Sequence, residues 1–213
     1  MHDFAESLAA ALDASSPTRL QVEGAREAAV LVPVVAHPAP RLLFTVRTDT
    51  VTSHKGQISF PGGSIDPGDA SPAAAAVREA REELGWDDTG LRLLGELDSI
   101  ETFVSGFVVT PVVGWLQRLP RLHPNPHEVA RVLVIPVAEL TQGVHAAPGF
   151  VHGGRTYPTE AWIHDDEVIW GVTARVLRLF LERLAAAGLT PAPPPAAAWA
   201  LPAAPGNRLT RSS

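Results

Sequence analysis

The sequence contains no cysteine, which excludes a disulfide framework, a thiol nucleophile and a thiolate metal site. Any metal ligand must therefore be an oxygen or an imidazole nitrogen. The sequence also lacks an apolar run of the roughly 20 residues that span a bilayer, and its start carries acids where a secretory signal would carry bases. These absences together predict a cytoplasmic protein that does not associate with a membrane.

Basic residues are scarce, since 17 Lys and Arg stand against 23 Asp and Glu and the formal net charge is -6. General nucleic-acid binding needs a basic surface that releases counterions from phosphates, so this composition argues against it. An anionic small molecule must instead meet cations that are placed locally, either on side chains or as a bound metal.

The chain has enough apolar material for one well-packed domain, because 46% of its 213 residues are hydrophobic. We expect an N-terminal helix and connection over residues 1–27, the main domain over residues 28–187 and an Ala/Pro-rich tail over residues 188–213. The tail has no periodic apolar face to bury, so its composition predicts that it is disordered or extended.

Apolar and β-branched runs predict a sheet of several strands. The first 25 or so residues are expected to form one amphipathic helix followed by a polar connection. A turn is expected at residues 61–63, a short turn or helix at residues 140–143 and a helix on the sheet surface at residues 171–187. Strands are predicted at residues 28–35, 41–47, 57–60, 91–100, 107–115 and 129–135.

The best-delimited element is a helix over residues 72–84, with Ser71 as its N-cap and Gly85 as its C-terminal stop. Glu79, Glu82 and Glu83 stand at i, i+3 and i+4 and are expected to share one face. Another face, roughly a third of a turn away, is expected to pack on the sheet. That apolar face comprises Ala73, Ala76, Val77, Ala80 and Leu84.

The three glutamates repel one another, by roughly 1 kcal/mol per pair in water and about 4 kcal/mol at an effective dielectric of about 20. A divalent cation would turn this cost into binding energy, and oxygen ligands without His or Cys favour Mg²⁺ or Mn²⁺. On the residues alone, a solvated acidic face is the alternative interpretation, because exposed like-charge pairs cost only about a few tenths of a kcal/mol.

Residues 62–86 resemble the Nudix box, and they read GGSIDPGDASPAAAAVREAREELGW. The matching positions are Gly63, Asp69, Arg78, Glu79, Ala80, Glu82, Glu83, Gly85 and Trp86. Two features depart from the family pattern: the first acid is Asp69 rather than Glu, and one extra residue separates it from Arg78. The half that runs from Arg-Glu to Gly is intact, whereas the role of Asp69 stays open.

The resemblance implies a Nudix fold, an α/β/α sandwich with a mixed β-sheet in which the box forms a loop-helix-loop. By the family pattern, Glu79, Glu82 and Glu83 bind Mg²⁺ or Mn²⁺ and carry the catalysis, and Glu79 is a candidate for the base toward the attacking water. Arg78 is the fourth catalytic candidate and is expected to form an ion pair that orients a neighbouring glutamate, with a direct contact to substrate as the alternative.

Upstream of the box, residues 42–63 are similar to the signature of the coenzyme A diphosphatase branch of the Nudix family. Leu43, Thr45, Arg47, Gly56 and residues 60–63 match, whereas Phe44, Thr48 and Thr52 depart from it. Residues 107–116, 126–140 and 169–177 also look like segments of that branch. The implied reaction is hydrolysis of coenzyme A, or its oxidised or acyl forms, to 3′,5′-ADP and a 4′-phosphopantetheine.

Arg47 and Lys55 are the candidates for contacts with substrate phosphates, with exposed strand-end charges as the alternative. The Gly62 and Gly63 backbone is a candidate for contact with metal or phosphate, with an ordinary turn as the alternative. Glu128 is a further candidate that approaches from a loop. His123 and His127 are read as loop residues, because no third nitrogen ligand stands at a matching spacing.

Two other functions are compatible with the resemblance. One is a Nudix hydrolase of a different diphosphate, such as an ADP-sugar or a dinucleotide, and the other is a Nudix module that senses a nucleotide without cutting it. Retention of all three glutamates argues against the sensor. The sequence leaves the oligomeric state open, with a homodimer among the options.

Overall fold

The computed structural model describes residues 2–14, 16–48, 56–87, 90–102, 106–142, 144–152 and 155–193, with the backbone alone at 2–3, 144–152 and 155–159. Its centre is an eight-stranded mixed sheet, with the order β3-β2-β1-β7-β5 and with β4, β6 and β8 paired to β1, β7 and β2. The strands are β1 Arg26–Val35, β2 Arg41–Arg47, β3 Ile58–Ser59, β4 Gly62–Ser64, β5 Arg92–Glu96, β6 Ile100–Thr102, β7 Phe107–Leu116 and β8 Val129–Pro136.

The sheet is mixed because β1 and β7 run parallel while the other described pairs are antiparallel. Arg26 pairs with Phe107 and Val35 with Leu116, so the two strands stay in register along their whole length. Both strands are nearly continuously apolar and buried. This pattern is typical of strands that are covered on both faces.

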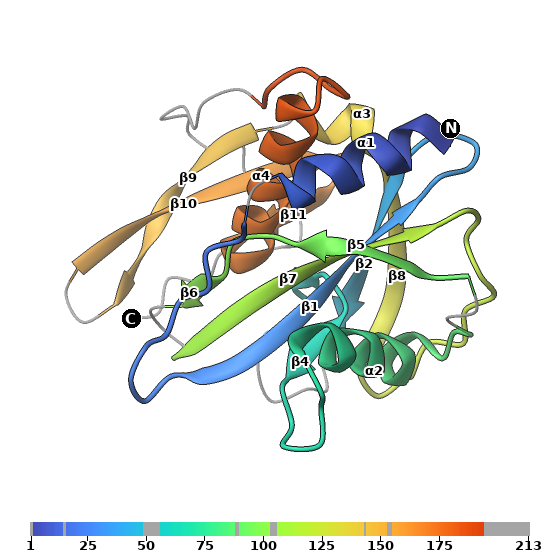
Figure 1. Ribbon diagram of the computed structural model, residues 1–213. Helices are drawn as coiled ribbons and strands as arrows, with labels where there is room; N and C mark the ends of the chain where they lie inside the picture. The colour runs from blue at the N-terminus through green and yellow to red at the C-terminus, as the bar shows by residue number, and fades with distance from the viewer. Residues whose placement is uncertain are drawn as a thin grey trace.

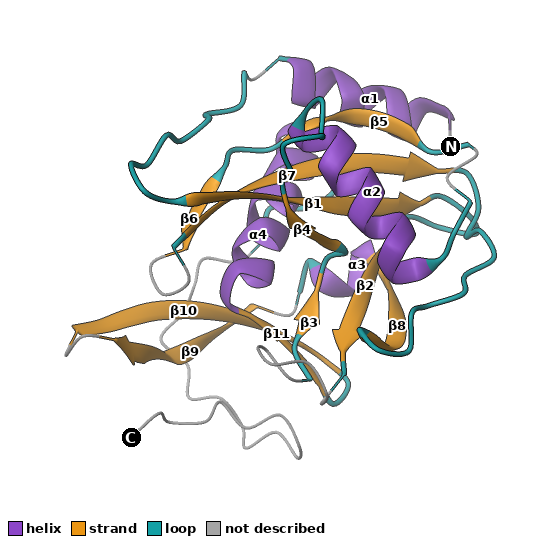
Figure 2. Ribbon diagram, turned by 90° about the horizontal axis from the view of Figure 1, so that it is seen from below, coloured by secondary structure: helices purple, strands orange, loops and turns teal. Residues whose placement is uncertain are grey.

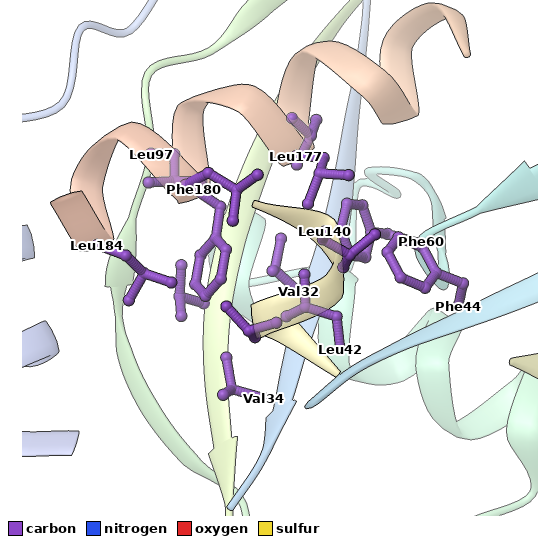
Figure 3. Packing of buried hydrophobic residues seen from close by; sticks show 14 of the residues in the cluster. Val32, Val34, Leu42, Phe44, Phe60, Leu97, Leu140, Leu177, Phe180 and Leu184 are labelled. Carbon is purple, nitrogen blue, oxygen red and sulfur yellow. The ribbon is translucent and has the colours of Figure 1, made fainter. Parts of the chain in front are cut away.

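Helices cover both faces of the sheet, which confirms the expected α/β/α sandwich. Helix α2 (Pro72–Leu84) lies on one side, and α1 (His2–Asp13) and α4 (Gly171–Ala186) lie on the other (Figure 1). The short α3 (Val137–Leu140) adds to the second layer. On that side Leu177, Phe180 and Leu184 of α4 pack toward Val32 and Val34 of β1 (Figure 3).

Helix α1 ends at Asp13, and an extended connection leads from it to β1. Its apolar face is buried: Leu8 and Leu12 belong to the main core, and the Phe4 ring stacks on Trp115 with centroids 5.8 Å apart. Across the described residues, none of the helices has both the length and the apolar character required to cross a bilayer.

A second sheet follows the first, and the sequence analysis did not predict it. It is antiparallel and contains β9 (Val144–His152), β10 (Arg155–His164) and β11 (Glu167–Trp170) in the order β11-β10-β9. Figure 2 shows the β9–β10 hairpin extending away from the main sheet, with β11 beside β3. The sequence of β9 gives a weak strand signal, because it contains Pro and Gly and lacks apolar alternation.

The prediction of a turn at residues 61–63 is wrong, because residues 62–64 form β4 and pair with β1. Ala29 lies opposite Gly63 and Val30 opposite Gly62, and the Leu31 amide donates to the Pro61 carbonyl at 2.8 Å. A Cβ on Gly62 would stand 2.3 Å from the Ala29 carbonyl oxygen. Glycine is therefore required here for close packing of two backbones, and not for chain reversal.

Candidate active site

Helix α2 has both of the caps that were predicted for it. The Ser71 hydroxyl accepts a hydrogen bond from the Ala74 amide at 3.1 Å, and Gly85 adopts the left-handed conformation with φ of 55°. Such caps satisfy backbone groups at the helix ends that have no partner within the helix. The helix therefore begins and ends where local chemistry dictates.

The segment 121–128 closes the C-terminal end of α2. The His123 amide donates to the Leu84 carbonyl and the Asn125 amide to the Glu83 carbonyl, each at 2.8 Å. A Cβ on Gly85 would stand 2.3 Å from the His123 carbonyl oxygen, so the two segments are in close contact. His123 and His127 are loop residues, as expected, and the hydrogen bonds of His123 and Asn125 to α2 come from their backbone amides.

The helix faces differ in part from the prediction. Ala75, Ala76, Ala80 and Leu84 are fully buried, whereas Ala73 and Val77 are only partly buried. Glu83 lies on the buried side as well, with 3% of its surface exposed. The prediction that all three glutamates stand on a face clear of the packed one is therefore wrong for Glu83.

Glu79 lies directly against the β4 backbone. A Cβ on Gly63 would stand 2.5 Å from the Glu79 carboxyl carbon, a distance that real Cβ atoms do not show. Burial raises the pKa of Glu79, while the Arg78 hydrogen bond opposes that shift. The glycine at position 63 thus allows a carboxylate to sit against the strand.

Arg78 joins the acids of the loop to those of the helix. It donates to both carboxylate oxygens of Asp69, at 3.0 and 2.9 Å, and to the Ser64 carbonyl at 3.0 Å. On its other side it donates to Glu79 at 2.9 Å and to Glu82 at 3.4 Å. The two-point pair with Asp69 is both strong and directional, so it fixes the position of the Arg78 guanidinium. The guanidinium in turn orients Glu79 through its hydrogen bond.

Asp69, whose role the sequence leaves open, is the partner of Arg78 in this two-point pair. The Arg78 hydrogen bonds hold the pKa of Asp69 below its ordinary value, and a bond between Asp69 and the Asp66 backbone adds to the shift. Its carboxylate therefore stays ionised and bound to Arg78. The charge of Asp69 thus lies on this arginine.

Glu83 is the most perturbed acid in the described part of the chain. Burial raises its pKa to about 8, Arg47 opposes the shift, and Glu128 and Glu79 add to it. Arg47 Nη1 lies 3.7 Å from Glu83 Oε1. The second carboxylate oxygen, Oε2, is buried and has no hydrogen-bond partner among the described atoms.

Glu128 reaches the same place from the segment 121–128. The Asn125 side chain donates to Glu128 Oε1 at 3.2 Å and accepts from the His127 amide at 3.1 Å. Thr48, next to Arg47 in the chain, donates through its amide to the Glu128 carbonyl and through its hydroxyl to the His127 carbonyl. Sequence reasoning missed Asn125, although its place in the Asn-Pro pair before Glu128 was a turn signal.

The other sequence candidates are distributed as follows. Gly62 and Gly63 lie in β4 beside α2, and Arg47 ends β2 beside Glu83. Glu82 stays at the surface, with 58% of its side chain exposed. Lys55 lies outside the described residues.

These residues suit a hard divalent cation in their chemistry. Among the described residues, no three acidic or imidazole side chains are gathered tightly enough to hold an ion as they stand. Arg78 holds Glu79 and Glu82, and Arg47 stands beside Glu83. The donors are all oxygens, and the unpartnered Glu83 Oε2 is a buried acceptor that a divalent cation would satisfy.

Comparison with known proteins agrees with the fold. The family described as the NUDIX domain matches residues 25–153. A protein of Cronobacter sakazakii named as an uncharacterized Nudix hydrolase, NudL, is 41% identical over 155 residues, which are 72% of this chain and 80% of that protein. The protein of the same name from Photorhabdus laumondii is 36% identical over 169 residues, covering 79% and 89%.

Among solved structures, a MutT/nudix family protein from Enterococcus faecalis is similar, with a TM-score of 0.52, 14% identity and coverage of 78% of this chain and 64% of that one. The fold and the site thus define a Nudix-fold enzyme with a glutamate-bearing helix. The chain belongs to the Nudix hydrolase family. It acts on pyrophosphate bonds of small-molecule substrates, and its family generally needs a divalent cation, typically Mg²⁺ or Mn²⁺.

Proposed function

We propose that this enzyme hydrolyses the diphosphate linkage of coenzyme A or its derivatives to 3′,5′-ADP and a 4′-phosphopantetheine. The observation that supports this substrate is the similarity of residues 42–63 to the coenzyme A diphosphatase signature. Two residues of that segment lie against the glutamate helix. Arg47 stands beside Glu83, and Gly63 lies against Glu79.

In this proposal Glu79, Glu82 and Glu83 hold the cations, and Glu128 is a further acid at the same place. When bound, Mg²⁺ or Mn²⁺ supplies positive charge that activates water and neutralises the bridging phosphates. Arg78 keeps Glu79 in position, and Glu79 accepts the proton of the attacking water. Arg47, Lys55 and the Gly62–Gly63 backbone bind the diphosphate.

The test is product analysis of coenzyme A hydrolysed in ¹⁸O-labelled water with Mg²⁺ or Mn²⁺. Mass spectrometry should find 3′,5′-ADP and 4′-phosphopantetheine, and the labelled fragment identifies the phosphorus that water attacks. A panel of diphosphates assayed in parallel supplies the comparison. A marked preference for an ADP-sugar, a dinucleotide or a nucleoside triphosphate would overturn the assignment to coenzyme A.

A non-catalytic sensor is disfavoured by the complete set of glutamates. Replacing the exposed Glu82 gives a direct test, because its side chain is not part of the packed core. Glu82→Gln should abolish turnover and leave the thermal unfolding midpoint of the chelated protein unchanged. Full turnover by this variant would remove the glutamate trio from the mechanism.

The cytoplasmic location, the division at residues 27 and 187 and a homodimer stay predictions. Sedimentation of the full chain at several concentrations measures the oligomeric state, and fractionation of cells measures the location. A monomer at all concentrations would remove the homodimer from the proposal and leave the reaction untouched.

A further inference from the structure

Arg47 lies against Glu83, which also accepts a hydrogen bond from the Gly62 backbone, yet both side chains keep a polar atom without a partner. Their closest atoms, Nη1 and Oε1, are 3.7 Å apart, which is longer than a hydrogen bond. Arg47 Nε and Glu83 Oε2 are both buried, and neither has a hydrogen-bond partner among the described atoms. Buried groups in this condition are costly, so this pair is poised to accept better partners.

The surroundings explain why a positive charge stands there. Glu79 and Glu128 both act on Glu83 as like charges, and only 4% of the Glu83 side chain is exposed. Water cannot screen three carboxylates well in such a place. The Arg47 guanidinium supplies opposite charge from the sheet side of the cluster.

The Arg47 side chain is placed so that it can move without disturbing the sheet. Its backbone is fixed at the end of β2, where its amide donates to the Gln57 carbonyl and its carbonyl accepts from the Gly56 amide. The pairing of β2 with β8 shifts register between Val46 and Arg47, so the ladder is already irregular at this residue. About 30% of the side chain is exposed, which leaves a route toward solvent.

We propose that Arg47 is an internal counter-ion of the glutamate cluster: it lies against Glu83 in the cation-free enzyme and is released to the substrate phosphates when a divalent cation binds the glutamates. Two cations near one buried carboxylate repel each other, so binding of one favours departure of the other. A released guanidinium has the planar donor geometry that phosphates accept. The inference rests on the metal site of the proposed function, but not on which diphosphate is cut.

The test separates metal binding from turnover. Mn²⁺ is titrated by calorimetry into chelator-treated full-length protein without substrate, for the wild type and for Arg47→Gln. Removing the competing charge should tighten Mn²⁺ binding by about tenfold. The sign holds even if a proton leaves Glu83, because the exchange still adds one positive charge. In steady-state assays with the best diphosphate of the panel, KM of the same variant should rise by about tenfold.

Two further variants control for charge and for shape. Arg41→Gln removes the same charge at the other end of β2, roughly 20 Å away, and should change Mn²⁺ affinity by less than about twofold. Arg47→Lys keeps the charge but loses the planar donor group, so Mn²⁺ affinity should stay near the wild-type value while KM rises. Unchanged or weaker Mn²⁺ binding by Arg47→Gln would overturn the proposal.

A measurement on the wild type avoids any effect of mutation on folding. Phenylglyoxal labels accessible guanidinium groups, and peptide mass spectrometry resolves the label on Arg47 from that on Arg41. Mn²⁺ should raise the labelling rate of Arg47 several-fold and leave that of Arg41 unchanged. An unchanged or lower rate at Arg47 would contradict release. If these results hold while coenzyme A is not cut, only the substrate assignment fails.

Discussion

At the scale of single residues, Arg78 connects the acidic loop to the glutamates. Its guanidinium donates two hydrogen bonds to Asp69 and others to Glu79 and to the Ser64 carbonyl. We therefore propose that Asp69 is a positioning residue, which acts through Arg78 and does not itself bind the cation. Residues that hold a catalytic group in place typically affect activity by about 10- to 100-fold.

The first prediction concerns Asp69→Asn, which keeps the shape of the side chain and removes its charge. We expect kcat to fall by about 10- to 100-fold, because Arg78 is no longer fixed against the loop. The matched control is Asp66→Asn. Its carboxylate is 3.6 Å from Arg78 and 65% exposed, so kcat should change by less than about twofold. Equal effects in the two variants would contradict the positioning role.

The second prediction concerns the stability of the chelated protein against pH. The pKa of Glu83 is about 8 in the folded protein and near its ordinary value of 4.5 in the unfolded chain. Between these values the folded state holds a proton that the unfolded chain has released. The free energy of unfolding should therefore fall as pH rises from about 5 to about 8, by at most about 1.4 kcal/mol per pH unit.

Urea denaturation in EDTA at several pH values measures this effect. The difference between wild type and Glu83→Gln isolates the contribution of this carboxyl. The variant should gain stability relative to the wild type as pH rises from about 5 to about 8. A flat difference for Glu83→Gln would show that this carboxyl does not titrate in the window.

The sequence predicted the helix that carries the three glutamates better than it predicted their environments. The spacing of Glu79, Glu82 and Glu83 located the acidic helix, because helix geometry is a local property. The burial of Glu83 depends on β2 and the segment 121–128 meeting the end of α2. Contacts of that kind leave no periodic trace in the sequence, and for the same reason Asn125 was missed.

At the scale of elements, the segment 121–128 links the last turn of α2 to the end of β2 through hydrogen bonds. It donates two backbone hydrogen bonds to the last turn of α2 and receives two from Thr48. Within this segment, the Asn125 side chain donates a hydrogen bond to the Glu128 carboxylate and so orients it. The position of Glu128 is thus set by a short loop that is tied at both of its sides.

The third prediction concerns Asn125→Ala. The backbone bonds to α2 remain, so the thermal midpoint should fall by only a few degrees, roughly the effect of 1 kcal/mol. Glu128 loses its partner, and kcat/KM should fall by about tenfold. His127→Ala is the control, because the described role of His127 is in its backbone, and it should retain nearly full kcat/KM. Wild-type activity in Asn125→Ala would remove Glu128 alignment from the site.

Elements with local signals were predicted well, and elements that depend on distant partners were not. The caps at Ser71 and Gly85 fixed α2 to the residue. Strand β4 was missed because a Pro-Gly-Gly sequence is typical of turns, and only pairing with β1 makes it a strand. The second sheet was missed because the composition of β9 does not favour a strand, and β9 is a strand through its pairing with β10.

At the scale of the whole molecule, α1 contributes to the same core as α4 and the central sheet. It precedes the segment matched by the family, yet Leu8 is fully buried in the main cluster. The fourth prediction is that Leu8→Ala lowers the free energy of unfolding by about 2–5 kcal/mol, as measured by urea denaturation. The exposed Leu20→Ala should change it by less than about 0.5 kcal/mol.

In contrast to the stability, the activity of the glutamate site should be little affected by Leu8→Ala. Leu8 lies on the opposite side of the sheet from α2, so kcat of the remaining folded Leu8→Ala protein should stay near the wild-type value at low temperature. A large loss of kcat with little loss of stability would show that α1 communicates with the glutamates.

The parallel pairing of β1 with β7 has a kinetic consequence. Every residue of the glutamate helix lies in the stretch of chain between these two strands, so the chain must close a long loop before the central ladder forms. Closure over such separations slows folding relative to proteins with mostly local contacts. Recovery of enzymatic activity after dilution from denaturant should therefore lag behind the early gain of helical circular dichroism.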